Sequence, residues 1–300
     1  MGLVSQDALN QLQALMDQVE EPLLRTFQNV HQGFVTETLM RFLKAREWNA
    51  TKAHKMIVDC LNWRVQSEID KILSGLPVFA IGVGLSTFDK ASVHYYVQSH
   101  IQINEYRDRV ILPSQSKKHE RPITTCVKVL DMTGLKLSAL NQIKLLTIIS
   151  SIDDLNYPEK TNTYYIVNAP YIFSACWKVV KPLLQERTRR KVQVLSGCGR
   201  DELLKIMDYA SLPHFCRREG SGSSRHSENG NESCYSLDHP FHQNLYNYIK
   251  EKSRVHEAVE PIKQGSFHVD FPEPPAEKAE IVKTLESELQ KFKISNESGD

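Results

Sequence analysis

The sequence lacks the cysteine spacings that are typical of disulfide-stabilised small folds or of zinc sites. Its six cysteines are scattered over 300 residues without a Cys-x-x-Cys pair. This usage is typical of reduced, buried thiols rather than of a disulfide framework or a zinc ribbon. We therefore expect a protein of a reducing compartment, the cytoplasm.

Long apolar runs and an excess of one charge are also missing. No run reaches the roughly 18 residues that cross a bilayer, and the polar N-terminus lacks the basic-then-apolar pattern of a signal peptide. The 37 basic residues nearly balance the 36 acidic ones, so no global field attracts nucleic acid. We expect no nucleic-acid partner, and an anionic ligand would have to be bound locally.

Nucleotide and hydrolase motifs are absent too. There is no Walker A loop, no Gly-x-Ser-x-Gly elbow and no His-Glu-x-x-His. Gly82 and Gly84 could begin a dinucleotide loop, but the third glycine is missing, and the fingerprint needs all three glycines. We therefore predict a protein without a cofactor and without enzymatic activity, although an α/β enzyme remains an alternative.

Two small clusters of ligand-type residues deserve an interpretation. Four of them could be drawn as a metal site, but their spacing fits no standard closed site: Cys234, Asp238, His239 and His242. Asp153 and Asp154 are neighbours rather than residues on one helix face, which favours a solvated helix end over paired acid-base work. We predict no metal.

The first part of the chain has helical periodicity. Apolar residues recur at helix spacing from Leu9 to Val19. The same spacing is found in residues 36–48 and 52–64. Asn49 is a candidate N-cap for the third of these helices. We predict a helical domain over residues 1–70.

The middle of the chain alternates between short apolar runs and helical patterns. Strands are predicted at residues 76–81, 123–130, 164–167 and 191–195, and helices at 138–155 and 171–184. Helices between strands are the usual crossovers of a parallel sheet. We predict an α/β domain over residues 75–219. The polar, Ser/Gly-rich stretch after Gly220 predicts a flexible linker and tail over 220–300, with a possible helix at 276–293.

Several short motifs resemble the CRAL-TRIO family, in the order and spacing of that family. They are the run from Leu39 to Trp48, the triplet Asn62-Trp63-Arg64, the turn Tyr157-Pro158-Glu159-Lys160, the run from Tyr165 to Pro170, and Lys181-Pro182-Leu183-Leu184. The resemblance implies a small N-terminal helical domain followed by a lipid-binding α/β domain, in which a mostly parallel sheet forms the floor and a mobile lid helix closes over one lipid.

The resemblance also assigns a polar site. Arg46, Glu159, Thr188 and Lys191 fall on the positions that contact a phosphoinositol headgroup in the family. A lysine neutralises a phosphate, and a carboxylate accepts from inositol hydroxyls. Considered one at a time, Glu159 could instead be an acidic residue at the start of a helix, and Lys191 could be an ordinary lysine at the edge of a strand.

A pair of family hydroxyl residues that contacts phosphatidylcholine is replaced here by Cys126 and Lys128. A thiol is a weak donor, and a lysine repels the choline cation. The resemblance therefore implies phosphatidylinositol as the ligand rather than phosphatidylcholine.

The segment 171–184 fits the lid of the family. We expect its apolar residues to contact acyl chains. We expect an anionic membrane surface to be contacted by the nearby basic residues Lys178, Lys181, Arg187, Arg189 and Arg190. An ordinary amphipathic packing helix would show the same pattern. The expected acyl-chain contacts are Phe173, Trp177, Val180 and Leu184.

These expectations combine into one function and one alternative. We predict a monomer that binds phosphatidylinositol without catalysis, touches membranes transiently, and transfers or presents the lipid. The alternative is a protein-interaction module in trafficking or signalling that uses the same fold. Only residues 65–74 stand where the family carries an additional strand and turn, so we expect that segment to be missing.

Overall fold

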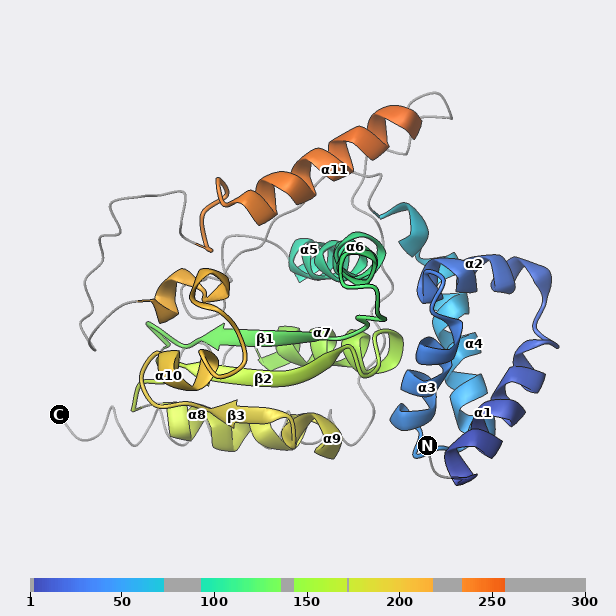
Figure 1. The fold of residues 1–300 in the computed structure, drawn as a ribbon, viewed down its shortest axis with the longest axis horizontal. Helices are drawn as coiled ribbons and strands as arrows, with labels where there is room; N and C mark the ends of the chain where they lie inside the picture. The colour runs from blue at the N-terminus through green and yellow to red at the C-terminus, as the bar shows by residue number, and fades with distance from the viewer. Residues whose placement is uncertain (1–2, 73–92, 136–142, 172, 218–233, 257–300) are drawn as a thin grey trace.

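The computed structural model describes residues 3–72, 93–135, 143–171, 173–217 and 234–256. A unit of four helices comes first and packs beside one end of an α/β layer (Figure 1). The helices are α1 (Leu3–Met16), α2 (Glu21–His31), α3 (Val35–Ala45) and α4 (Ala50–Gln66). The expected helical character of the first 66 residues is therefore confirmed.

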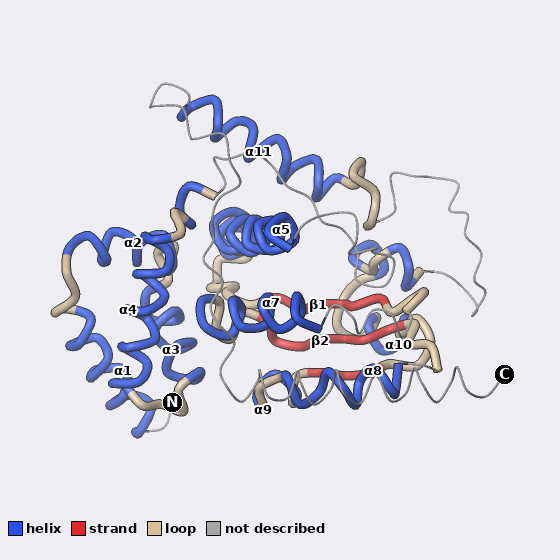
Figure 2. Tube along the Cα trace, turned by 180° about the vertical axis from the view of Figure 1, so that it is seen from behind, coloured by secondary structure: helices blue, strands red, loops and turns tan. Residues whose placement is uncertain are grey.

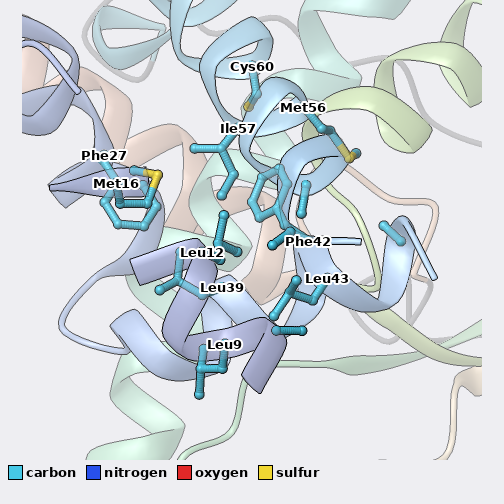
Figure 3. Packing of buried hydrophobic residues seen from close by; sticks show 14 of the residues in the cluster. Leu9, Leu12, Met16, Phe27, Leu39, Phe42, Leu43, Met56, Ile57 and Cys60 are labelled. Carbon is cyan, nitrogen blue, oxygen red and sulfur yellow. The ribbon is translucent and has the colours of Figure 1, made fainter. Parts of the chain in front are cut away.

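The helical unit has its own apolar core (Figure 3). Leu12 from α1, Phe42 and Leu43 from α3 and Ile57 from α4 are at most 1% exposed. Asn49 caps α4, because its side chain accepts a 2.9 Å hydrogen bond from the Lys52 amide. The predicted N-cap is therefore confirmed.

A three-stranded parallel sheet forms the floor of the α/β layer. Its strands are β1 (Cys126–Asp131), β2 (Thr161–Val167) and β3 (Val192–Val194), in the order β1-β2-β3. Lys128 pairs with Tyr164, and Tyr164 with Val192. Three of the four predicted strands are thus confirmed as parallel neighbours, while the predicted strand 76–81 lies outside the described residues.

Helices cover both faces of this sheet. Seen from behind, α7 (Ile143–Asn156) and α8 (Phe173–Val180) lie on one face (Figure 2). The other face carries α10 (Arg200–Leu203) and the 3-10 turns η5 (Tyr209–Ser211) and η6 (His214–Cys216). Leu203, Leu212 and Cys216 pack there against Val167 of β2.

The expected lid helix is shorter as an α-helix than the predicted range 171–184. It ends at Val180 and continues as the 3-10 turn η4 (Lys181–Leu183). Pro182 accounts for the change, because proline has no backbone N–H to extend the α-helical ladder. A short helix, α9 (Glu186–Arg189), then leads into β3.

A long helical stretch beside β1 was not predicted from the sequence. It consists of α5 (Val93–Tyr106), the π-helical segment η2 (Arg107–Ile111) and α6 (Leu112–Lys118). Another unpredicted element, α11 (Pro240–His256), lies above α5 in Figure 1. Leu245 and Ile249 of α11 are buried with Ile101 of α5, so this part of the predicted flexible tail is a docked helix. The predicted helix 276–293 lies outside the described residues.

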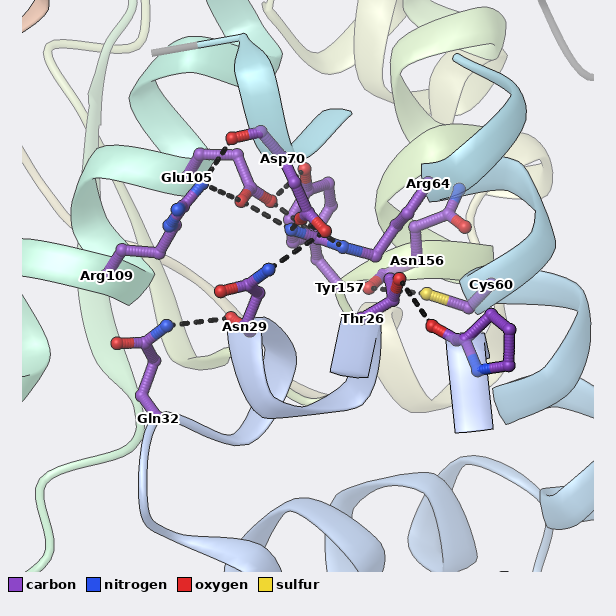
Figure 4. A network of polar contacts seen from close by, with 11 residues as sticks. Thr26, Asn29, Gln32, Cys60, Arg64, Asp70, Glu105, Arg109, Asn156 and Tyr157 are labelled. Carbon is purple, nitrogen blue, oxygen red and sulfur yellow. Dashed lines mark hydrogen bonds and ion pairs between the residues drawn. The ribbon is translucent and has the colours of Figure 1, made fainter. Parts of the chain in front are cut away.

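A buried polar network joins the helical unit to the α/β layer (Figure 4). Arg64 of α4 donates to both Glu105 oxygens at 2.8 and 2.7 Å and reaches Asp70 in the 3-10 turn η1 (Ile69–Lys71). Tyr157 also donates to Glu105 at 2.8 Å. Burial and then Glu105 raise the pKa of the Tyr157 hydroxyl. Because α4 and η1 occupy residues 50–66 and 69–71, the described part of the interval 65–74 contains no strand.

Candidate functional site: a polar cleft at the strand ends

A polar cleft opens at the amino ends of the strands, on the side facing the helical unit. It encloses about 420 Å³, counted to its open mouth. The turn between α7 and β2 contributes Glu159, α9 contributes Thr188, and Lys191 immediately precedes β3. The lining also includes Arg107, Lys128, Asp153, Asp154, Tyr157, Pro158, Lys160, Thr161, Tyr164 and Arg187.

Glu159 and Lys191 form the centre of the cleft. Lys191 Nζ lies 2.6 Å from Glu159 Oε2 and donates to the Thr161 carbonyl at 3.0 Å. Arg187 Nε lies 3.5 Å from the other Glu159 oxygen. The backbone of Lys191 is also held in place, because its carbonyl accepts a 2.9 Å hydrogen bond from the Tyr164 amide. One carboxylate is thus flanked by two cations at fixed positions.

The backbone of Glu159 adopts a left-handed conformation with φ of 56°. A residue with a side chain pays about 1–2 kcal/mol for this region. The chain reverses its direction between α7 and β2 within the four residues from Tyr157 to Lys160. The end of this turn is fixed to β1, because the Cys126 amide donates a 2.9 Å hydrogen bond to the Lys160 carbonyl. Such strain is characteristic of functional sites.

Arg46 lies next to the cleft rather than in its lining. It is the first residue after α3 and donates to the Ala45 carbonyl at 3.0 Å. Arg187, which does line the cleft, donates to the same carbonyl. Burial and then Arg187 lower the pKa of Arg46. The structure therefore brings Glu159, Thr188 and Lys191 together and links Arg46 to them through Arg187.

The sequence interpretation missed a second polar group in the cleft. Asp153 was expected to be a solvated helix end, and this was wrong: it lies 2.7 Å from His100 Nε2 and accepts from Asn104 at 2.9 Å. Lys128 Nζ is 3.7 Å from its other oxygen. Burial alone would raise the pKa of Asp153, but His100 and Lys128 hold it below its ordinary value.

Hydrogen-bond donors and hydrogen-bond acceptors both line the cleft. Among its lining residues five cations face three carboxylates, so a ligand with one negative charge meets a positively charged lining. Carboxylates that already hold cations can still accept from hydroxyl groups. This arrangement suits a polyol that carries a phosphate, because charge-assisted hydrogen bonds are the strong ones in a partly dry site.

The expected lid residues lie on α8 and just beyond it. Phe173 and Trp177 stack with ring centroids 6.0 Å apart, and both are half-buried, as are Val180 and Leu184. Lys178 and Lys181 are exposed. The element therefore presents an apolar row next to exposed lysines.

The cysteine and histidine residues after residue 233 make local contacts. His242 Nε2 lies 3.1 Å from the Cys234 carbonyl, and the rings of His239 and His242 are 6.0 Å apart. Within the described part of the chain, no three His, Cys, Asp or Glu side chains are grouped to hold a metal ion. Nor does any described helix combine the length and apolarity needed to cross a membrane.

The parallel sheet, the preceding helical unit and the polar cleft between them define an α/β protein of the CRAL/TRIO type. Comparison with known families agrees. The CRAL/TRIO domain matches residues 74–216, and the CRAL/TRIO N-terminal domain matches residues 8–59. The chain belongs to the CRAL/TRIO family.

Named relatives include proteins of plants and fungi. The phosphatidylinositol/phosphatidylcholine transfer protein SFH12 of Arabidopsis thaliana is 29% identical over 226 residues, which cover 64% of this chain and 42% of that protein. The SEC14 cytosolic factor of Eremothecium gossypii is 28% identical over 206 residues, covering 59% and 67%. The chain thus spans less than half the length of the plant relative.

A solved structure also matches. The crystal structure of Sfh5 superposes with a TM-score of 0.53 over 82% of this chain and 98% of that one, at 15% sequence identity. At this identity the match establishes the fold alone. The predicted fold class, a helical unit followed by a CRAL/TRIO domain with a parallel sheet, is confirmed.

Proposed function

We propose that this protein binds phosphatidylinositol and moves it between membranes or presents it, without catalysing a reaction. The observation that carries the proposal is the Glu159–Lys191 pair, 2.6 Å apart, flanked by Thr188 and Arg187 in one open cleft. Lys191 and Arg187 would hold the phosphodiester, and Glu159 and Thr188 would bond inositol hydroxyls. The relatives named as phosphatidylinositol/phosphatidylcholine transfer proteins support the same class of ligand.

Transfer through water requires a substitute for the bilayer. Each exposed lipid methylene costs about 0.8 kcal/mol, so two bare acyl chains amount to tens of kcal/mol. In this proposal the half-buried row Phe173, Trp177, Val180 and Leu184 covers the chains, and α8 moves to admit them. The exposed Lys178 and Lys181 would contact an anionic membrane for the duration of exchange.

The choice of phosphatidylinositol over phosphatidylcholine rests on Lys128. Its ammonium lies above the Tyr164 ring, 5.6 Å from the centroid, and lines the cleft. An aromatic face that could attract a choline cation is therefore occupied by a cation of the protein itself. We accordingly propose a monomeric, cytoplasmic protein that prefers the inositol lipid.

The proposal is tested by Lys191→Met and Glu159→Gln, which remove charge and keep side-chain length. Losing one charged hydrogen-bond partner costs about 1.5–3 kcal/mol, so vesicle-to-vesicle transfer of labelled phosphatidylinositol should fall roughly 10- to 100-fold. Lys205→Met is the matched control, because Lys205 is exposed and pairs only locally with Glu202, 2.7 Å away.

Unchanged phosphatidylinositol transfer by both cleft variants would contradict the assignment of the cleft. Absence of any lipid transfer by the unmodified protein would contradict the function itself and favour the interaction module.

A further inference from the structure

A second cluster of charged residues is buried between the helical unit and the sheet, and it adjoins the headgroup cleft. Arg41 comes from α3, Arg107 and Asp108 from η2, and Lys160 from the end of the α7–β2 turn. Arg41 is 6% exposed and Lys160 9%, while the side chains of Arg107 and Asp108 are 11% and 10% exposed. Charges buried to this degree require partners.

The single carboxylate of this cluster is fully engaged. Asp108 Oδ1 accepts from Arg107 Nε at 2.6 Å, and Lys160 Nζ lies 3.0 Å from Asp108 Oδ2. Arg41 is left with one contact, a 2.8 Å hydrogen bond from Nη2 to the Thr38 hydroxyl. Its Nε and Nη1, together with Arg107 Nη2, are buried and find no hydrogen-bond partner within the described part of the chain.

Three cations therefore share one carboxylate, and the groups packed around them do not restore the balance. Asp153 is already engaged by His100 and Lys128. Glu105 lines the first hollow as well, but Arg64 and Tyr157 already engage it. Asp70 is engaged by Arg64 and Asn29. Glu37, one helical turn before Arg41, is only half-buried. A buried cation without a counter-charge destabilises the folded state.

Space for a ligand adjoins the unpaired groups. Two narrow hollows that open to solvent, each with room for about one water-sized occupant, are both lined by Arg41, Asp108 and Lys160. The first lies toward Tyr157 and Arg64, the second toward Phe34 and Leu112. Free guanidinium donors and room for an occupant thus occur at the same place.

We propose that this junction binds a small monovalent inorganic anion of the chloride class, held by Arg41 with Lys160 and Arg107 nearby. The occupant is small and singly charged because the Asp108 carboxylate lines both hollows and repels a multiply charged oxyanion. The bound anion ties α3 to the residue that follows Glu159, and so fixes the wall between the helical unit and the headgroup cleft. Lys160 and Arg107 also line the headgroup cleft, so the anion site adjoins that cleft, but it does not require a bound lipid.

The first test measures the thermal midpoint of the whole chain in sodium gluconate, titrated with sodium chloride at constant ionic strength. A ligand that binds only the folded state raises the midpoint, so we expect a saturable increase. Arg41→Met should abolish that increase. Arg25→Met, on the neighbouring helix and with its side chain 74% exposed, should retain it.

The second test needs no variant and decides the matter if Arg41→Met fails to fold. Crystals of the unmodified protein grown in sodium bromide should show an anomalous peak within contact distance of Arg41. Equal midpoints in gluconate and chloride, an ordered water without anomalous signal at Arg41, or stabilisation by phosphate but not by halide would each overturn the proposal.

Discussion

Arg64 joins the helical unit to the α/β layer through two hydrogen bonds to Glu105. Its side chain is 3% exposed and that of its partner Glu105 2%. Removing one member of a buried pair leaves an uncompensated charge, which costs about 3–5 kcal/mol. Arg64→Met should therefore lower the free energy of unfolding, measured in urea, by that amount.

The control is Lys55→Met, because Lys55 pairs with Asp59 at 2.7 Å but both side chains are more than half exposed. Exposed pairs contribute about 0–1 kcal/mol. A loss in Arg64→Met no larger than in this control would show that the network is not what holds the two units together.

Lys160 gives the stability a defined pH dependence. Burial lowers its pKa from 10.5 to about 8, despite the opposing effect of Asp108. The unfolded chain thus binds more protons than the folded one between these values, so stability rises as the pH increases from 8 to 10.5. The shift corresponds to on the order of 3 kcal/mol.

The measurement is urea unfolding of the unmodified protein and of Lys160→Met in chloride-free gluconate buffer. The difference in unfolding free energy between the two should grow in favour of the unmodified protein as the pH increases from 8 to 10.5. A difference that is flat or shrinks over this window would refute the depressed pKa.

Individual site residues differed in how far the sequence could predict them. Glu159 and Lys191 stand in or beside short contiguous motifs, so a family resemblance places them. Their contact across 32 positions is a result of the parallel pairing of β2 and β3. Asp153 comes from α7, whereas His100 and Arg107 come from the continuous stretch of α5 and η2, and these two segments meet only after packing. The residues next to Asp153 in the sequence do not reveal these partners, so it was predicted to be solvated.

At the level of elements, α5 was missed because much of its buried side is polar, although Val97 and Ile101 are buried as well. Gln98, Ser99, Gln102, Asn104 and Glu105 of this helix are all at most 3% exposed. They are buried as partners of other polar groups; Gln102 Nε2, for example, donates to the Ile72 carbonyl at 3.0 Å. A search for apolar periodicity cannot detect such a face. The strands, by contrast, are short apolar runs and were predicted.

The docking of α11 can be tested directly. Ile249 is fully buried, and Tyr106 of α5 meets Tyr248 and Phe241 of α11 with ring centroids 5.4 and 6.0 Å apart. Ile249→Ala removes apolar contacts and leaves a cavity, so it should lower the free energy of unfolding by about 2–5 kcal/mol. Denaturant unfolding monitored by circular dichroism measures this.

The control for α11 is Glu251→Ala, because Glu251 is exposed on the same helix and surface changes usually stay within about 0.5 kcal/mol. If Ile249→Ala were as stable as this control, α11 would not be part of the folded core.

On the scale of the whole molecule, the headgroup cleft lies where two separately packed units meet. Arg187 from the α/β layer donates to the Ala45 carbonyl at the end of α3, so the helical unit closes one wall of the cleft. The order of the units could be predicted from periodicity and motif order. Their contact could not, because it depends on a buried ion pair and a part-buried hydrogen bond between residues 41 and 142 positions apart.

The central claim is that the chain carries phosphatidylinositol in this cleft. The most direct measurement is mass spectrometry of the lipids extracted from the gently purified protein, beside those from Lys191→Met. We predict that phosphatidylinositol is enriched over phosphatidylcholine relative to the host membrane, and that the variant loses this enrichment. An unmodified protein that is empty, or that carries phosphatidylcholine in preference, would contradict the account.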